Sequence, residues 1–145
     1  MKTNGGFLIT KVKQLNDRIF EKILAKKNVD AFNGPQGRIL YVLWQEDGVP
    51  IKTISEKSGL AITSLTTMLE RMEKNGLIGR RQDESDKRKT LLFLTDRARN
   101  LKNDYDSVSD EMGNIFYEGF SQKEIREFES YLEKIIMNLE KWSEK

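Results

Sequence analysis

Residues 59–95 read GLAITSLTTMLERMEKNGLIGRRQDESDKRKTLLFLT, and the spacing of apolar residues changes within this stretch. In residues 65–72 apolar side chains recur every three or four positions, which predicts an amphipathic helix. Asn75-Gly76 closes that helix, because glycine readily adopts the left-handed conformation of a helix cap. Beyond this point the helical spacing stops, so a different element must follow.

The second half of the stretch predicts a β-hairpin. Residues 77–81 and 89–94 are short runs with branched or aromatic side chains, and they flank the polar stretch 82–88. On the other side, a short helix is predicted from Pro50, joined to the longer one by the turn 58–60. In DNA-binding helix-turn-helix proteins the second helix of such a pair enters the major groove. The helix pair alone is weak evidence, because many all-α proteins contain one.

The rest of the chain is predicted to be helical. Amphipathic spacing predicts helices over residues 7–27 and 35–45. Thr95 offers an N-cap, and a heptad series from Ala98 to Gly119 predicts one helix of about 25 residues. Its narrow apolar stripe calls for a partner helix, from another subunit or from the next helix of the same chain. A capping box at 121–124 starts that next helix. The predicted fold class is mainly α with a small β-hairpin wing.

Composition excludes several function classes. The 145 residues contain no Cys and no His, which removes thiol chemistry, the commonest metal ligands and the usual general base. We therefore expect no metal, no cofactor and no enzyme activity. Lys and Arg exceed Asp and Glu by 3 in residues 1–49 and by 4 in 50–100, whereas acidic residues exceed basic ones by 5 in 101–145. A basic middle suggests a polyanionic partner.

The helix that follows the turn carries an unusual set of outward residues. Small hydroxyl side chains stand where an exposed helix would favour Glu, Lys or Ala, and they can contact base edges, phosphates or thymine methyls. Arg71 is spaced to share their face and to reach a phosphate or a guanine. The candidate DNA contacts on this helix are Thr63, Ser64, Thr66, Thr67 and Arg71. The alternatives are a capping role for Thr63 or Ser64 and a solvated Arg71.

The predicted hairpin adds a basic tip. A planar guanidinium on a protruding loop can enter a narrow minor groove, where the negative potential is deepest. Asp86 is unfavourable beside DNA unless it orients Arg88 through a charge-assisted hydrogen bond. The candidate residues of the hairpin are Arg80, Asp86, Lys87, Arg88 and Lys89, and the alternative for each charge is a solvated loop.

These residues carry a family resemblance. The segments Met72–Arg80, Asp86-Lys87-Arg88 and Leu94-Thr95 resemble the winged helix-turn-helix of the multiple antibiotic resistance regulator (MarR) family, and Gln36-Gly37-Arg38-Ile39-Leu40 is similar to the same family's second helix. The resemblance implies that Arg88 reaches the minor groove and that Asp86 positions it. Many relatives carry a basic residue in place of Thr67, and the family's thiol-based oxidation sensing is excluded here.

The resemblance also implies an organisation and a function. It implies an N-terminal dimerisation helix in residues 1–34, a winged helix-turn-helix domain in 35–95, and C-terminal dimerisation helices in 96–145, the first and last parts forming one dimerisation region. The implied function is a homodimeric transcriptional regulator that binds a pseudo-palindromic operator in double-stranded DNA and represses until a small-molecule effector releases it. The side chains expected near that ligand are Arg18, Tyr41 and Trp44, for which ordinary packing and surface charge are the alternatives.

Two other functions compete with this one. The acidic C-terminal segment and long helices would also suit a helical protein-interaction adaptor that never contacts nucleic acid. The acidic cluster of Asp83, Glu84 and Asp86 would be needed for a carboxylate-based hydrolase, but a mobile hairpin tip offers no pocket to tune pKa values. No apolar run reaches the length of a membrane span and no signal peptide is apparent, so we expect a soluble, cytoplasmic protein without a membrane partner.

Overall fold

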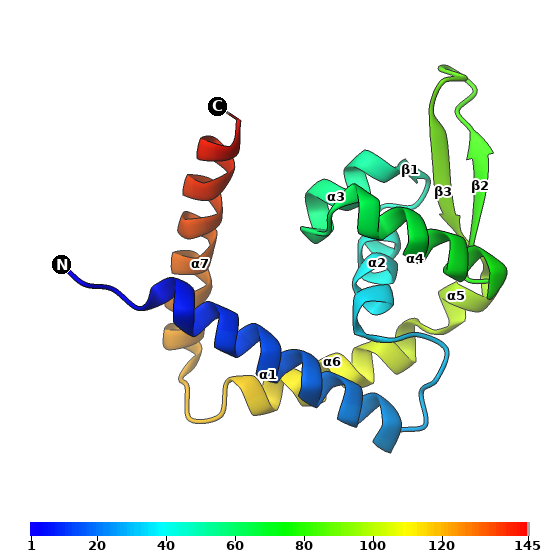
Figure 1. Cartoon of the computed structure of the whole chain (residues 1–145). Coiled ribbons are helices and arrows are strands. Elements are labelled where there is room, and N and C mark those ends of the chain that lie inside the picture. The colour runs from blue at the N-terminus through cyan, green and yellow to red at the C-terminus, as the bar shows by residue number, and fades with distance from the viewer. Residues whose placement is uncertain (145) are drawn as a thin grey trace. The chain divides into compact units, whose positions relative to one another are not determined.

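The computed structural model describes residues 1–144, which form two compact units, one of residues 1–112 and one that begins at Gly113. The first unit contains most of the helices and a small sheet (Figure 1). Its helices are α1 (Gly5–Lys26), α2 (Gly34–Gln45), α3 (Ile51–Ser58), α4 (Ile62–Lys74), α5 (Asp96–Asn100) and most of α6 (Lys102–Phe116). The predicted class, mainly α with a hairpin wing, is confirmed.

Helix boundaries follow local signals. Asn33 caps α2 through a capping box with Gln36, and Pro35 lies in the first turn, where a missing N–H costs nothing. Pro50 is the N-cap residue of α3, and Gly59 ends that helix with φ 75°. Gly76, with φ 74°, follows α4. The predicted starts and stops of these three helices are therefore confirmed to within a residue or two.

The sheet has one strand more than the sequence predicts. Strands β2 (Ile78–Gln82) and β3 (Thr90–Leu94) form the predicted antiparallel hairpin, with Ile78 opposite Leu94 and Gln82 opposite Thr90. A two-residue strand, β1 (Val49–Pro50), pairs with the other edge of β3, which gives the order β1-β3-β2. Two residues are too short to show an alternating pattern, so this strand leaves no signal in the sequence.

The core joins the helix-turn-helix to the base of the hairpin. Leu65, Leu69 and Met72 on α4 are completely buried, as is Ile54 on α3. They belong to one apolar cluster with residues of α2 and of the strands. The fully buried large side chains of this cluster are Ile39, Leu40, Leu43, Ile54, Leu65, Leu69, Met72, Leu77, Leu92 and Val108. Packing on this core fixes which face of α4 remains exposed.

The single long helix predicted from Thr95 to Gly119 is wrong in two respects. It is interrupted at Leu101 between α5 and α6, and α6 ends at Phe116. At the interruption the Ala98 carbonyl accepts a hydrogen bond from the Leu101 N–H, only three residues on, and another from the Trp44 indole. A side chain that bonds into the helical ladder tightens the turn in this way.

The apolar stripe of that segment also has a different role from the one predicted. Ala98, Val108 and Met112 are buried in the chain's own core, and Leu101 and Tyr105 pack against it. Only Ile115, beyond these residues, is a large exposed side chain of the series. The heptad spacing up to Met112 therefore reflects packing within the first unit rather than an open seam for a partner helix.

The second unit contains the end of α6 and helix α7 (Gln122–Ser143). The predicted capping box of Ser121 and Glu124 starts α7. At the base of the unit the Tyr117 hydroxyl donates a hydrogen bond of 2.7 Å to Glu129, and the Tyr117 ring lies edge-on to Phe128. Burial, together with that carboxylate, raises the pKa of Tyr117 to about 12. Within residues 1–144 no helix is long and apolar enough to cross a membrane.

Candidate nucleic-acid interface

Helix α4 presents an uncharged first half to solvent. Ala61 is the N-cap residue, and its methyl side chain makes no capping hydrogen bond, so Thr63 and Ser64 lie in the first turn without capping the helix. The capping role weighed for them is therefore wrong. Thr66 and Thr67 are also exposed, and the Thr66 hydroxyl donates a hydrogen bond of 2.9 Å to the Ile62 carbonyl. All four predicted hydroxyl residues thus remain accessible on one helix.

Arg71 lies further along the same helix and is exposed. Within residues 1–144 no acidic side chain comes within ion-pair distance of Arg71. Its guanidinium is therefore available to an external anion. This exposure fits both the predicted DNA contact and the alternative of a solvated Arg71.

The hairpin tip orients its arginine. The Asp86 carboxylate lies 3.1 Å from the Arg88 Nε and 3.3 Å from one terminal nitrogen of the guanidinium, and it also accepts the Arg88 backbone N–H at 3.1 Å. The Arg88 side chain is nevertheless 90% exposed. Bonding to Arg88 lowers the pKa of Asp86. The predicted charge-assisted pair is therefore present, with the guanidinium held outward.

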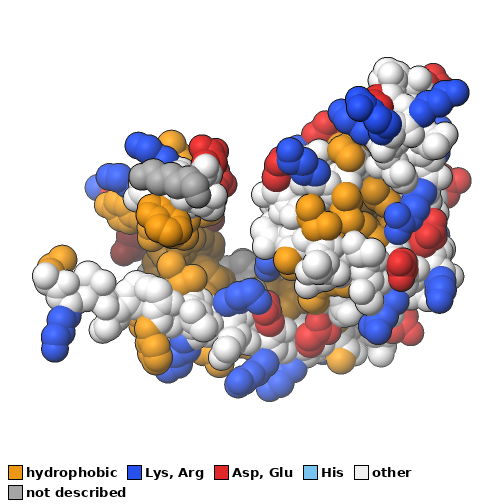
Figure 2. Space-filling view, turned by 45° about the horizontal axis from the view of Figure 1, so that its top comes forward, with side chains coloured by type: hydrophobic (Ala, Val, Ile, Leu, Met, Phe, Trp, Pro, Cys, Tyr) orange, Lys and Arg blue, Asp and Glu red, His pale blue; other side chains and the backbone are white. Residues whose placement is uncertain are grey.

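A tight turn carries the neighbouring charges. The Asp83 N–H donates to the Lys89 carbonyl and the Lys89 N–H donates to the Asp86 carbonyl, both at 3.0 Å, which closes the tip. Lys87 and Lys89 lie beside it and are exposed. In Figure 2, Lys and Arg side chains gather at the upper right, where the β2–β3 hairpin projects. The tip therefore carries the cations Lys87, Arg88 and Lys89 beside three carboxylates, of which Asp86 is paired with Arg88.

Both arginines of β2 contact a neighbouring side chain. Arg80 lies 3.3 Å from Glu73 of α4, so its charge is already partly neutralised. The Arg81 guanidinium lies 3.7 Å from the centre of the Phe93 ring on the neighbouring strand, a cation–π contact. Arg80 is thus exposed, but it is less available to a phosphate than the lysines at the tip.

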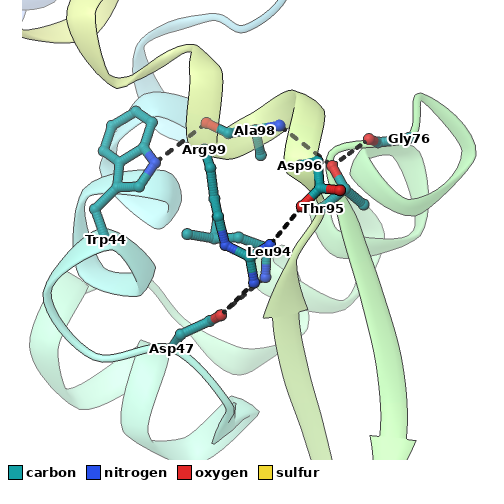
Figure 3. A network of polar contacts seen from close by, with 8 residues as sticks. All are labelled: Trp44, Asp47, Gly76, Leu94, Thr95, Asp96, Ala98 and Arg99. Atoms are coloured by element: carbon teal, nitrogen blue, oxygen red, sulfur yellow. Dashed lines mark hydrogen bonds and ion pairs between the residues drawn. The ribbon is translucent and has the colours of Figure 1, made fainter.

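A polar network anchors the hairpin at its base (Figure 3). Asp47, in the turn after α2, accepts the Leu94 N–H at 2.9 Å through one oxygen and lies 3.2 Å from Arg99 through the other. Thr95 caps α5 by accepting the Ala98 N–H and donates its own hydroxyl hydrogen to the Gly76 carbonyl at 2.6 Å. The ends of α4, β3 and α2 are thereby tied to the start of α5. Sequence reasoning identified Thr95 as a cap but missed Asp47, whose only signal was its place in an Asp-Gly turn.

The predicted ligand residues are only partly brought together. Tyr41 stacks on Tyr105 with ring centres 5.8 Å apart, and Trp44 meets the same ring at 5.1 Å. Sequence reasoning placed Tyr105 only in the apolar series, but its ring contacts both of the others. Burial raises the pKa of Tyr105, although the nearby charge of Arg38 acts in the opposite direction. Arg18 is exposed on α1 and makes no hydrogen bond or ion pair with another residue of 1–144.

The acidic residues of the tip lack the features of a catalytic group. Hydrogen bonds from Ser85 lower the pKa of Asp83, and Arg88 lowers that of Asp86. A general acid needs the opposite shift, toward neutrality. In the part of the chain that the structure describes, no group of three or more Asp and Glu side chains could hold a metal ion. The hydrolase reading therefore has no support in the geometry.

These features define a winged helix-turn-helix protein: α3 and α4 form the helix pair, and β2 and β3 form the wing. The family model that matches residues 32–90 is that of the MarR family. The HTH-type transcriptional regulator MgrA of Staphylococcus aureus is 29% identical over 133 residues, which cover 92% of this chain and 87% of MgrA. Residues 32–90 thus carry a MarR-family domain, and the relatives of the chain are transcriptional regulators rather than enzymes.

Two further comparisons agree with this match. The HTH-type transcriptional regulator TtmR of Methylorubrum extorquens (strain PA1) is 37% identical over 81 residues, which cover 56% of this chain but only 42% of the length of TtmR. A crystal structure of a MarR mutant from E. coli complexed with operator DNA has the same fold, with a TM-score of 0.80, 22% identity, and coverage of 90% of this chain and 91% of that chain.

Proposed function

We propose that this protein is a sequence-specific regulator of transcription that binds double-stranded DNA as a homodimer. In this proposal α4 lies in the major groove, Arg88 enters the adjacent minor groove, and Lys87 and Lys89 contact phosphates. The single observation that carries the proposal is the Asp86–Arg88 pair, which holds a 90% exposed guanidinium at the tip of a protruding hairpin. Such a regulator would act in the cytoplasm, where the operator lies.

The dimer is supported by apolar side chains at the ends of the chain. On α1 the first three turns expose large apolar residues, although the last turn of the same helix is buried in the core. On α7 no residue is buried, and the second half of the helix is the most exposed. Exposed apolar side chains gathered on a helix are typical of interfaces. The residues concerned are Phe7, Leu8, Val12 and Leu15 on α1 and Ile135, Ile136, Leu139 and Trp142 on α7.

We further propose that the regulator represses transcription and that a small ligand releases it. The ligand site would include Tyr41 and Trp44, which meet on Tyr105, with a nearby cation for an anionic group. Arg18 is the cation expected from the sequence, and Arg38 is a second candidate because its charge acts on Tyr105. Trp44 also donates a hydrogen bond to Ala98 at the base of the wing, so a ligand that moves Trp44 would disturb that anchor.

The test is selection of bound sequences from a random duplex DNA pool at low salt. A dimer with one winged domain per subunit should recover an inverted repeat whose half-sites lie about one helical turn apart. Recovery of single half-sites would contradict the dimer but not DNA binding. Recovery of nothing above background would contradict the proposal and favour the protein-interaction adaptor, whose complexes would survive nuclease treatment.

A further inference from the structure

The first two turns of α4 carry four outward side chains that end in methyl groups. They are Ile62, Thr63, Thr66 and Thr67, and all four are exposed, Ile62 to 47%. Residues four apart on a helix are neighbours, so Ile62 lies beside Thr66 and Thr63 beside Thr67, in two adjacent rows. The opposite face of these turns is fixed in the core by Leu65 and Leu69. The chain thus presents a methyl-bearing surface where the helix would meet DNA.

This surface lacks the usual groups that read purines. Between Ile62 and Leu69 there is no Arg, Lys, Asn or Gln, the side chains that make bidentate hydrogen bonds to guanine or adenine. The nearest is Arg71, nine residues from Ile62 and therefore about 13 Å further along the helix. The Thr66 hydroxyl hydrogen is already bonded to the Ile62 carbonyl at 2.9 Å, so it is not available to a base.

We propose that α4 recognises its operator chiefly through thymine C5-methyl groups, contacted by Ile62, Thr63, Thr66 and Thr67. The thymine methyl is the one apolar group that the four base pairs present in the major groove. An exposed isoleucine beside three threonines would cover such methyls with a gain from apolar burial, whereas hydrogen bonding alone would give Ile62 no role. This inference rests on the proposed function and specifies the chemistry of the DNA that the same site takes.

The experiment replaces thymine by deoxyuridine, which differs only by the missing methyl, at each half-site position of the selected operator. Affinity is measured at fixed salt for the full-length protein. We expect at least one position in each half-site where the replacement weakens binding by about fourfold, the effect of one buried methyl group. Replacement in the spacer between half-sites is the matched DNA control and should leave the affinity unchanged.

Protein variants make the assignment specific. Thr63→Ser and Thr67→Ser remove one methyl each and keep the hydroxyl. Each variant should weaken binding to the thymine operator. On an operator with deoxyuridine at the position that the threonine contacts, the variant should bind as the wild type does, because that methyl contact is already absent. Thr10→Ser is the matched control, since Thr10 is an exposed helical threonine of α1, outside the helix pair.

Two results would overturn the inference while leaving DNA binding intact. One is an operator whose affinity is unchanged by deoxyuridine at every half-site thymine. The other is a selected half-site without thymine. Failure of the wild type to bind any duplex would instead overturn the proposed function, and the inference with it.

Discussion

The Asp86 carboxylate binds the Arg88 side chain at 3.1 Å and the Arg88 backbone N–H at the same distance, so one residue of the wing fixes both the turn and the direction of its arginine. An acidic group at the tip of a DNA-binding hairpin would otherwise repel phosphates. Here it is tied to the cation that it serves. From this relationship we predict that Asp86 positions Arg88, so that loss of the carboxylate weakens DNA binding.

Asp86→Asn should weaken operator binding although it makes the protein more positive. The amide keeps an oxygen for the backbone N–H but loses the charge that holds the guanidinium, so Arg88 becomes free to point elsewhere. Affinity at fixed salt, measured beside Glu84→Gln as a charge-matched control on the same loop, checks this. Tighter binding by Asp86→Asn would identify Asp86 as a mere repulsive charge.

The lysines of the tip should set the salt dependence of binding. Each phosphate contact releases counterions, so Lys87→Ala and Lys89→Ala should each lower the slope of log affinity against log salt by about 1. Arg80→Ala should change the slope less, because Glu73 already lies 3.3 Å from that guanidinium. Titrations at four or more salt concentrations measure the slopes. If Arg80→Ala and Lys87→Ala change the slope equally, the Arg80–Glu73 ion pair breaks when the protein binds DNA.

Operator binding should be independent of pH between about 5 and 8 at constant salt, the range in which an ordinary histidine titrates. The chain has no histidine, and the pKa of Asp86 is lowered from an ordinary value of 3.8 by its bond to Arg88. A lowered pKa keeps Asp86 ionised throughout this range, so the pair is lost only as the pH falls below that ordinary value. A binding curve that bends near neutral pH would require a titrating group that this account does not contain.

The anchor at the base of the wing should contribute to stability mainly through a backbone hydrogen bond. Asp47→Ala leaves the Leu94 N–H without its partner and should lower the free energy of unfolding by about 1–2 kcal/mol. Asp47→Asn keeps an acceptor and loses only the partly exposed pair with Arg99, a change of less than about 1 kcal/mol. Urea denaturation with unchanged slope measures both. Equal losses would mean that the ion pair, not the hydrogen bond, is the main contribution.

Much of this structure could be predicted from the sequence because its signals are local. The helix-turn-helix, the hairpin and the Asp86–Arg88 pair depend on caps, turns and residue spacing within a short stretch of chain. Contacts between distant segments left no such signal. The Trp44 indole that tightens the turn at Leu101, and the Asp47 carboxylate that binds Leu94, come from residues about 50 positions away.

The absence of a sequence signal for distant contacts also explains why the prediction for the heptad stripe was wrong. Spacing shows that one face of the helical segment after Thr95 is apolar, but not what covers that face. The core of the chain itself covers it as far as Met112. Ile62 was not among the predicted contacts of α4, and the packed structure shows that it is 47% exposed.

The most direct test of the central claim is the affinity of Arg88→Ala for the selected operator, compared with the wild type at the same salt concentration. Removal of one arginine contact should weaken binding by about five- to 150-fold, from a loss of about 1–3 kcal/mol. Arg88→Lys should bind more tightly than Arg88→Ala but more weakly than the wild type, because lysine keeps the charge and lacks the planar guanidinium. Arg126→Ala, an exposed arginine of α7, should bind like the wild type. Unchanged affinity of Arg88→Ala would contradict the assignment of the wing to the minor groove.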